Sequence, residues 1–536
     1  MAQKKFNVLI SDNIAQEGID LLKDAGIEVT INTNLSHEEL KSEIPKYDGI
    51  IVRSGTKMTA DVISVAENLK VIARAGAGYN NIDVGACSER GIVVMITPTG
   101  NTIAVVELTM GLMLTWARNI SQANSCLKEN KWEKSKYKGT ELFQKTLGIV
   151  GLGRIGQGVA KRAQAFNMNV VAYDKFVPKS RAKELNVKLY DNLNDMLKEV
   201  DYLTLHVPLN ESTRNLIDKE QFELMRPGAV IINAARGGVI NEKELYTALK
   251  KEKIGGACID VYSEEPAKKE KFPFIDLENV VTTPHLGASS KEAQINVATL
   301  AADHVIKGLK SNIFIDSVNL PFKLPGHLAE VYKPYMELAE YLGKFIGNSI
   351  EGRINKMSIE YRGDDFSTFD PIKSIILYST FKNRLNDVVT YMNLEDLISE
   401  NGIHIEVKKI EKKTNLSNLI KLKVDTDKPS ESMSRLVGTV FSGRPKFMEI
   451  NENYIDISPS DYMLLIESID KPGVIGKVGT FLGNKGINIA GWQLGRDTRG
   501  SKALSVITLD DALDQQILNE LKELGDMISA KFIDLQ

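Results

Sequence analysis

The sequence predicts an α/β protein of two doubly wound parallel sheets with a hinged cleft between them, followed by two smaller α+β units. Short β-branched runs alternate with helical stretches in residues 6–97 and again in residues 146–288, which is the pattern of parallel sheets. Residues 325–455 mix strand and helix patterns without motif residues. Residues 461–536 read strand, helix, strand, strand, helix, strand, which is typical of a ferredoxin-like sandwich.

The length of 536 residues is too great for one hydrophobic core, so we expect several domains. The pattern places a discontinuous first domain at 1–100 and 288–318, because a helical stretch from Ser289 carries the chain back to the first sheet. A second domain occupies 101–287, an intervening domain 319–457 and a terminal domain 458–536. Residues 101–130 are expected to form one long helix.

Composition and charge exclude several classes of partner. The chain has 67 basic and 70 acidic residues and a net charge of −3, so we expect neither nucleic acid nor membrane as a partner. Three cysteines lie far apart without metal-ligand spacing, which favours reduced thiols, no metal site and a cytoplasmic protein. The apolar run at 103–117 is shorter than the ~20 residues that span a bilayer, and we expect a buried or dimer-interface helix there.

Residues 147–174 form a complete, Rossmann-like dinucleotide-binding unit. Gly151 allows a tight turn after an apolar strand, Gly153 lets the backbone approach a pyrophosphate, and Gly156 lets the following helix pack close to the sheet. The helix N-terminus then faces the anion. Asp174 ends the next strand, where it can accept hydrogen bonds from ribose hydroxyls and would repel a 2′-phosphate. The expected cofactor is therefore NAD rather than NADP.

Three polar residues follow successive strands of the same half: Arg236 after VIINAA, Glu265 in DVYSEEP and His285 after VVTTP. Oxidation of a secondary alcohol by hydride transfer needs a base, and imidazole suits that task near neutral pH. Glu265 would orient the ring and stabilise the imidazolium, and Arg236 would hold a substrate carboxylate. Each residue alone could be a loop, turn or surface group. Their occurrence together beside a dinucleotide motif favours a hydroxy-acid dehydrogenase.

The segments GLGRIG, NAARGG, DVYSEEP and PHLGAS, in this order and spacing, resemble the D-2-hydroxyacid dehydrogenase family. The resemblance extends over essentially the full chain and is strongest to the long enzymes that carry a C-terminal ACT domain. It implies NAD-dependent oxidation of 3-phospho-D-glycerate to 3-phosphohydroxypyruvate, the first step of L-serine biosynthesis, by a homodimer or homotetramer. It also implies Arg236, Glu265 and His285 as the catalytic set, with His285 as acid and base.

The resemblance further implies cofactor contacts from the glycine motif and from residues that follow the strands. They are Ala77, Gly151, Gly153, Arg154, Ile155, Gly156, Asp174, Val207, Pro208, Ala234, Ala235, Arg236, Asp260, His285, Leu286, Gly287 and Ala288. His206, next to this set, is expected to be structural.

Arg53 in IVRSGTK and Arg74 in IARAGAG close strands of the first sheet, toward the predicted cleft. Arginines are costly to bury without an anion, and in the resembled family such positions hold the phosphate and carboxylate of the substrate. Asn101, at the crossing between domains, belongs with them. Lys134, in a lysine-rich arm, could add a phosphate contact across a dimer interface, although a solvated surface charge explains it equally well.

The C-terminal segment IDKPGVIGKVGTFLGNKGINIAGWQLGR resembles an ACT regulatory domain, which in this family binds L-serine between paired domains. Asp470 and Asn488 match the ligand positions of that motif. The resemblance therefore implies L-serine as an effector held by these two residues.

Two other functions stay open at the level of sequence. One is a reductase of the same family that acts on glyoxylate, hydroxypyruvate or another 2-keto acid, against which the paired arginines and the regulatory tail argue. The other is an NAD-sensing interaction protein, which would be expected to carry an extended partner-binding surface or a disordered tail.

Overall fold

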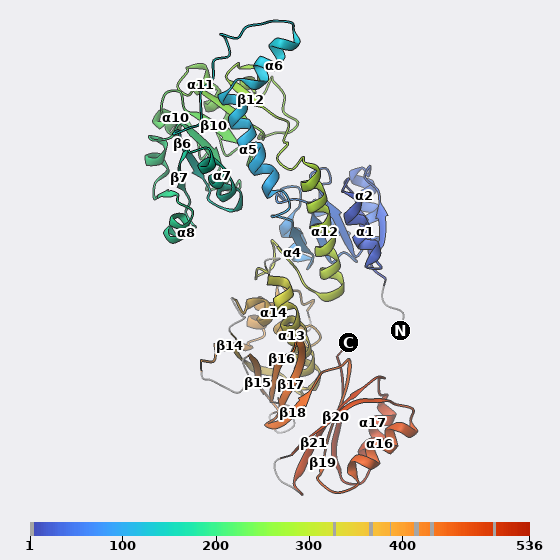
Figure 1. Cartoon of the computed structure of the whole chain (residues 1–536). Coiled ribbons are helices and arrows are strands. Elements are labelled where there is room, and N and C mark those ends of the chain that lie inside the picture. Colours follow the sequence, from blue (N-terminus) through green and yellow to red (C-terminus); the bar gives the residue numbers. More distant parts are fainter. Residues whose placement is uncertain are drawn as a thin grey trace.

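The computed structural model describes residues 5–324, 328–363, 368–385, 387–411, 418–428, 434–496 and 500–535. In Figure 1 the chain forms four successive units, each built around one sheet. The unit of the seven-stranded sheet lies at one end, next to the five-stranded sheet, and the six-stranded and four-stranded sheets follow toward the other end. The predicted fold class is confirmed, with two parallel α/β sheets followed by a mixed and an antiparallel sheet.

The first sheet is wholly parallel, in the order β2-β1-β3-β4-β5. Its strands read as apolar runs because helices cover both faces. The helix α12 (Lys291–Ser311) packs against α1, β3 and β4. After the second sheet, the chain therefore returns to cover the first sheet. The elements are β1 (Asn7–Ile10), α1 (Gln16–Asp24), β2 (Glu28–Ile31), α2 (His37–Glu43), the 3₁₀ turn η1 (Ile44–Lys46), β3 (Gly49–Val52), α3 (Ala60–Ser64), β4 (Val71–Arg74), α4 (Val84–Glu89) and β5 (Val93–Ile96).

The second sheet is also parallel, in the order β12-β11-β10-β9-β6-β7-β8. Strands β7 and β8 are added on one side of β6 and strands β9 to β12 on the other, so the strand order switches between β6 and β9. Ligands of doubly wound sheets bind at that point, outside the carboxyl ends of the strands. The elements are β6 (Thr146–Val150), α7 (Arg154–Ala165), β7 (Asn169–Tyr173), α8 (Lys179–Glu184), β8 (Lys188–Tyr190), α9 (Leu193–Leu197), β9 (Tyr202–Leu205), α10 (Lys219–Leu224), β10 (Val230–Asn233), α11 (Glu242–Lys250), β11 (Gly256–Ile259), η2 (Pro273–Asp276) and β12 (Val280–Thr282).

The expectation of one long helix over residues 101–130 is wrong. Two helices, α5 (Thr102–Ala117) and α6 (Ile120–Lys128), are separated at Asn119, whose φ of 53° lies in the left-handed region. A left-handed residue cannot continue a right-handed helix, and asparagine adopts that conformation more readily than most residues. In the described part of the chain no single helix has the length and apolar character to cross a membrane, while α5 and α6, bent by 64°, meet that criterion only as a pair.

The third sheet is mixed, in the order β14-β13-β15-β16-β17-β18, and the fourth is antiparallel, in the order β20-β21-β19-β22. Helix α13 packs against α14 and against β16 and β17. The fourth sheet has the ferredoxin-like succession that the sequence predicts. The elements are α13 (Ala329–Ser349), β13 (Ile354–Arg362), α14 (Asp370–Phe381), α15 (Leu394–Glu400), β14 (His404–Lys409), β15 (Leu419–Thr426), β16 (Arg435–Phe441), β17 (Arg444–Ile450), β18 (Asn453–Ile457), β19 (Tyr462–Ile469), α16 (Val474–Asn484), β20 (Ile489–Arg496), β21 (Lys502–Leu509), α17 (Gln515–Lys522) and β22 (Met527–Asp534).

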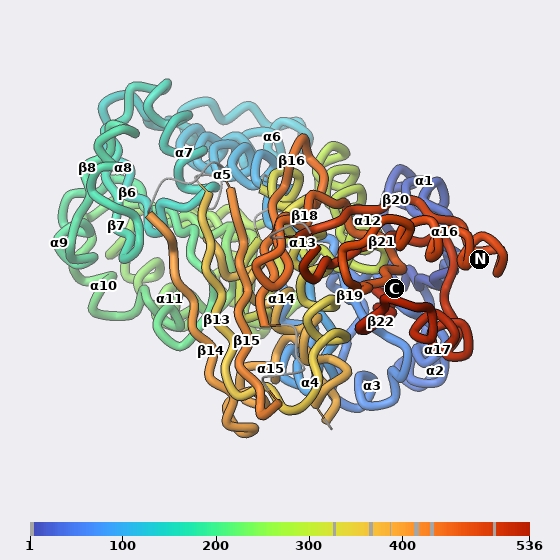
Figure 2. Tube along the Cα trace, turned by 90° about the horizontal axis from the view of Figure 1, so that it is seen from below, coloured from blue at the N-terminus to red at the C-terminus, as the bar shows by residue number. Residues whose placement is uncertain are grey.

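One continuous hydrophobic core joins the first sheet to the units that follow it. It extends from Val8 in β1 to Leu535 after β22. At the junction the buried ring of Tyr391 lies edge-on to Phe314 and Phe322, at centroid distances of 5.8 and 6.2 Å. The seven-stranded sheet has separate cores on its two faces. In the view from below, Figure 2, the sheet with β6 and β7 lies on the opposite side from α1 and α2 of the first sheet. The first sheet therefore packs more continuously with the C-terminal units than with the seven-stranded sheet.

Candidate active site

The predicted site residues gather where the carboxyl ends of the two parallel sheets meet. Arg74 ends β4, and Arg236 follows β10. A Cβ atom on Gly78 would lie 2.6 Å from Nη2 of Arg236, so the loop after β4 contacts the turn after β10. Ala77 lies in this same loop. The two sheets thus approach each other at the edge where ligands of such folds bind.

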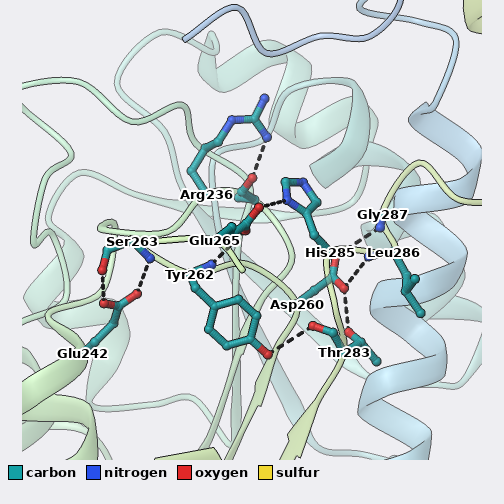
Figure 3. A network of polar contacts seen from close by, with 11 residues as sticks. Arg236, Glu242, Asp260, Tyr262, Ser263, Glu265, Thr283, His285, Leu286 and Gly287 are labelled. Carbon is teal, nitrogen blue, oxygen red and sulfur yellow. Dashed lines mark hydrogen bonds and ion pairs between the residues drawn. The ribbon is translucent and has the colours of Figure 1, made fainter. Parts of the chain in front are cut away.

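His285 and Glu265 form a direct contact in this region (Figure 3). His285 Nδ1 lies 2.7 Å from Glu265 Oε2, and the backbone N–H of Tyr262 donates to Glu265 Oε1 over 3.2 Å. A carboxylate on Nδ1 fixes the tautomer of the ring and leaves Nε2 as the nitrogen that exchanges a proton with a ligand. The pair has the arrangement that a general acid or base and its orienting carboxylate require.

Asp260 holds the backbone of the segment that carries His285. Its fully buried carboxylate accepts hydrogen bonds from Thr283 Oγ1 at 2.6 Å, Leu286 N at 2.7 Å and Gly287 N at 3.0 Å. Burial raises the pKa of Asp260, and these hydrogen bonds oppose that effect. His285 has a φ of 55°, which is a costly conformation for a residue with a side chain. The contacts of Asp260 with the next two residues support this strained position.

The turn that carries Arg236 packs directly on the segment that leads to Glu265. A Cβ atom on Gly237 would overlap the carbonyl group of Tyr262, so only glycine permits this approach. Glu242, at the start of α11, accepts hydrogen bonds from the backbone N–H of Ser263 at 2.7 Å and from its hydroxyl. Figure 3 shows this contact beside Glu265 and His285. Sequence reasoning missed Glu242. The only indication of its role in the sequence is its position directly after the segment NAARGGVIN.

Positive charges converge on the cleft. Burial, together with the positive charges of Arg236 and Arg53, lowers the pKa of Arg74 to about 10. Burial also lowers the pKa of Arg236, while Glu265 opposes that shift. Within the described ranges, Nε of Arg74 is buried without a hydrogen-bond partner. The charges of Arg236 and Arg53 disfavour the ionised form of Arg74, so the three arginines form a site suited to an anion.

Arg53 is held by the loop that follows β1. The backbone N–H groups of Arg53 and Thr56 donate to Asp12 Oδ2 at 2.6 and 3.1 Å, and Arg53 Nη1 donates to the carbonyl of Asn13 at 3.0 Å. Asn81 donates to the carbonyls of Arg53 and Thr56. Sequence analysis missed Asp12, although it follows the first strand by only two residues.

The glycine motif has the geometry that a dinucleotide needs. Gly151 has a φ of 94°, and a Cβ atom there would lie 2.6 Å from the carbonyl oxygen of His206. A Cβ on Gly156 would overlap the carbonyl of Gly151. Gly153 caps α7 with open space around its Cβ position, so a pyrophosphate can approach the N-terminus of this helix. Arg154 and Ile155 begin α7, and the residues present fit the cofactor.

Asp174 has a second task besides the expected one. Its Oδ2 accepts from Leu152 N at 2.7 Å, and its Oδ1 accepts from Phe176 N at 2.8 Å and Val177 N at 3.0 Å. The acid therefore fixes the glycine loop. Oδ1 already accepts two hydrogen bonds, while Oδ2 retains a lone pair for a further donor. Val207, Pro208, Ala234, Ala235 and Ala288 lie beyond the ends of β9, β10 and β12, on the same edge of the sheet.

His206 follows β9, with its Nε2 3.1 Å from Thr204 Oγ1. Burial lowers its pKa to about 3, so the ring is neutral at physiological pH. A neutral, buried ring suits the structural role expected of it.

Two predicted substrate residues have contrasting positions. Asn101 immediately precedes α5, where its side chain forms no capping hydrogen bond. Lys134 lies in an exposed turn whose neighbour Lys136 is 3.8 Å from Glu278, before the start of β12. His285 follows the other end of β12, and Figure 1 shows the arm beyond α6, away from the first sheet. Within one chain Lys134 is therefore separated from the other substrate residues.

The predicted effector residues lie at opposite ends of the fourth sheet. Asp470 Oδ2 accepts from Arg496 Nη1 at 2.7 Å, beyond the ends of β19 and β20. Asn488 donates to Asp510 before the start of β20. The eight residues of β20 separate them by roughly 25 Å at ~3.3 Å per residue. One ACT unit alone does not bring the two side chains together. In the described residues, no cluster of histidine, cysteine or acidic side chains could hold a metal ion.

Comparison with known proteins identifies three segments of the chain. Residues 110–287 match the NAD binding domain of D-isomer specific 2-hydroxyacid dehydrogenases, 331–451 the D-3-phosphoglycerate dehydrogenase intervening domain, and 462–526 the ACT domain. A D-3-phosphoglycerate dehydrogenase of Methanocaldococcus jannaschii is 40% identical over 98% of this chain and 99% of its own length. One of Archaeoglobus fulgidus is 40% identical over 99% of this chain and 100% of its own.

Among solved structures, a D-lactate dehydrogenase of Aquifex aeolicus, complexed with NAD and lactic acid, is 28% identical to this chain. The match has a TM-score of 0.51 and covers 57% of this chain and 96% of that one. The two relatives are similar over nearly the full length, and the intervening and ACT segments match in addition to the NAD-binding domain. The chain therefore belongs to the D-3-phosphoglycerate dehydrogenase family, within the D-isomer-specific 2-hydroxyacid dehydrogenases.

Proposed function

We propose that this protein oxidises 3-phospho-D-glycerate to 3-phosphohydroxypyruvate with NAD, in the first step of L-serine biosynthesis. The observation that carries the proposal is the contact of 2.7 Å between His285 and Glu265, beside the buried guanidinium groups of Arg74 and Arg236. The name shared by the full-length relatives supports this substrate. Turnover of 3-phospho-D-glycerate, compared with D-glycerate, tests it.

The residues divide the work of the reaction as follows. Arg236 holds the substrate carboxylate by charge-assisted hydrogen bonds, and Asn101 assists at the crossing between domains. His285 Nε2 takes the hydroxyl proton, and Glu265 stabilises the imidazolium that results. Bound NAD accepts the hydride. In the reverse direction the same imidazolium returns the proton.

The cluster of Arg53, Arg74 and Arg236 favours a substrate with two anionic groups over an unphosphorylated 2-keto acid. The positive charges of Arg53 and Arg236 disfavour the ionised form of Arg74, and a substrate with both a carboxylate and a phosphate relieves that repulsion best. A reductase of glyoxylate would need only one of these groups. An NAD-sensing protein without turnover would not need an oriented His285 and Glu265.

The proposal also covers the roles of the domains, the oligomeric state and the cellular compartment. We assign substrate binding to 1–100 and 288–318, NAD binding to 101–287, and regulation to 458–536, with 319–457 between them. A homodimer or homotetramer would allow Lys134 of one subunit to reach the site of another, which one chain alone does not permit. Cys87, Cys126 and Cys258 are buried free thiols, in keeping with the cytoplasm.

L-serine is the proposed effector. Asp470 can accept from its ammonium, and Asn488 can donate to its carboxylate. Because the two residues lie at opposite ends of one sheet, the site requires Asp470 of one subunit and Asn488 of another. Serine at that distance from His285 can act only by favouring a less active arrangement of the domains.

The first prediction concerns the choice of cofactor. Asp174→Ala should weaken NAD binding and narrow the gap between NAD and NADP, because the acid no longer accepts from the ribose or repels a 2′-phosphate. Kinetics with both cofactors measure this. Equal efficiency of the unaltered protein with NADP would contradict the assignment, and Lys175 would be the first residue to examine. Since Asp174 also fixes the glycine loop, Asp174→Asn serves as the milder control.

The second prediction concerns proton transfer. His285→Ala should lower kcat by about 10²–10⁴-fold with NAD affinity nearly intact, as expected when a general base is lost. Glu265→Gln should retain turnover but move the acidic limb of the pH profile to lower pH, since an amide stabilises an imidazolium less than a carboxylate does. Near-normal kcat in His285→Ala would remove His285 from the mechanism.

The third prediction separates the two substrate arginines. Arg74→Ala should lose ~1.5–3 kcal/mol of substrate binding, the scale of a charge-assisted hydrogen bond. Arg53→Ala should impair 3-phospho-D-glycerate more than D-glycerate. Steady-state kinetics with both substrates measure the difference, and equal losses would assign Arg53 a structural role.

The fourth prediction concerns regulation. L-serine should lower activity, with a coupling of ~1–3 kcal/mol at most, and Asp470→Ala should abolish the effect without changing basal turnover. Calorimetry and kinetics at several serine concentrations measure both quantities. A lack of serine binding to the intact protein would refute this proposal and leave the proposed reaction untouched.

A further inference from the structure

A cavity of about 580 Å³ lies between the loop of Arg53 and the start of α12. Ala15 and Arg53 line it from the first sheet, and Ser289, Ser290, Lys291, Gln294 and Ile295 line it from the other side. These last residues directly follow the segment of His285 to Ala288. In Figure 1 the first turn of α12 lies at the end of the helix that faces α5 and the nucleotide-binding unit. One wall of the cavity is therefore formed by residues that directly follow the proposed catalytic segment in the sequence.

The charged side chains that line the cavity are both basic. Arg53 and Lys291 approach it from different walls, and no carboxylate lines it. Within the described part of the chain neither side chain takes part in an ion pair closer than 4.0 Å. A hollow with positive charge on two sides and no internal counter-ion attracts an anion.

The walls of this cavity are fixed before any ligand binds. Asp12 and Asn81 hold the loop of Arg53 through the backbone contacts described above. Gln294 Nε2 donates to the carbonyl of Ala288 at 2.6 Å, which ties α12 to the catalytic segment. The hydroxyl of Ser290 already caps α12 by accepting from Ala293 N at 3.1 Å. The attraction for an anion therefore comes mainly from the two cations, with the hydroxyl of Ser289 as an added donor.

We propose that Lys291 and Arg53 together form the subsite for the phosphate group of the substrate. The inference rests on the proposed function, and it assigns the carboxylate end of the substrate to Arg236 and Arg74. Arginine binds a phosphate with paired hydrogen bonds, and lysine adds a compact second charge. Lys291 then determines specificity for the phosphorylated substrate and takes no part in proton transfer.

The test compares 3-phospho-D-glycerate with D-glycerate, using NAD, in the full-length protein. Lys291→Gln should lower kcat/KM for 3-phospho-D-glycerate by about tenfold to a hundredfold, the effect of one charge-assisted hydrogen bond. The kcat/KM for D-glycerate should stay nearly the same, because that substrate lacks the phosphate. Lys333→Gln on α13 removes one exposed lysine far from the cavity and serves as the matched control. It should change neither value.

Two further variants make the result decisive. Lys291→Arg should retain most of the preference for the phosphorylated substrate. Lys291→Gln should lower kcat/KM for 3-phospho-D-glycerate by a smaller factor in an Arg53→Gln background than in the unaltered protein, because both residues bind the same phosphate group. An unchanged preference in Lys291→Gln, or an equal loss with both substrates, would overturn the subsite and leave the proposed reaction standing. If the unaltered protein shows no preference for 3-phospho-D-glycerate, the proposed function fails and the subsite fails with it.

Discussion

The mutual repulsion of buried guanidinium groups is the constraint on which the site depends. Arg74 ends a strand of the first sheet and Arg236 follows a strand of the second, and burial and the charges of Arg236 and Arg53 disfavour the ionised form of Arg74. Like charges at short range are costly where water is excluded. An anionic ligand removes this cost only when both sheets contribute to its site. Substrate binding therefore stabilises the arrangement in which the two sheets meet.

Contacts between neighbouring loops of the second sheet hold the proposed catalytic residues in position. Asp260 holds the strained segment of His285, and Gly237 lets the Arg236 turn pack on Tyr262. Glu242 then anchors Ser263, two residues before Glu265. Since each loop contacts the next, the positions of Arg236, Glu265 and His285 are not independent. A substitution at Glu242 or Asp260 is therefore expected to displace a proposed catalytic side chain that the substituted residue does not itself contact.

Sequence patterns predicted the fold class and the strand ends well because both follow from local rules. Alternation of strands and helices marked the parallel sheets, and the glycine spacing identified the dinucleotide turn. The break at Asn119 was missed because its neighbours, such as Ala117, Arg118 and Ile120, are all compatible with a helix, so one left-handed residue decided the outcome. Sequence analysis missed Asp12 and Glu242 because their hydrogen-bond partners lie more than 20 residues away in the sequence. It missed Lys291 because Arg53 lies across a cavity from it, and no local motif predicts such an arrangement.

The distribution of the cores indicates how regulation could reach the active site. The first sheet shares one core with the six-stranded and four-stranded units, through Tyr391 packed on Phe314 and Phe322. The nucleotide-binding sheet has its own cores and joins the first sheet by two chain crossings, before α5 and before α12. A displacement of the C-terminal units is therefore transmitted more readily to Arg53 and Arg74 than to His285. An effector that acts through these units would change substrate binding by moving the arginines relative to Arg236, while the pair of His285 and Glu265 stays intact.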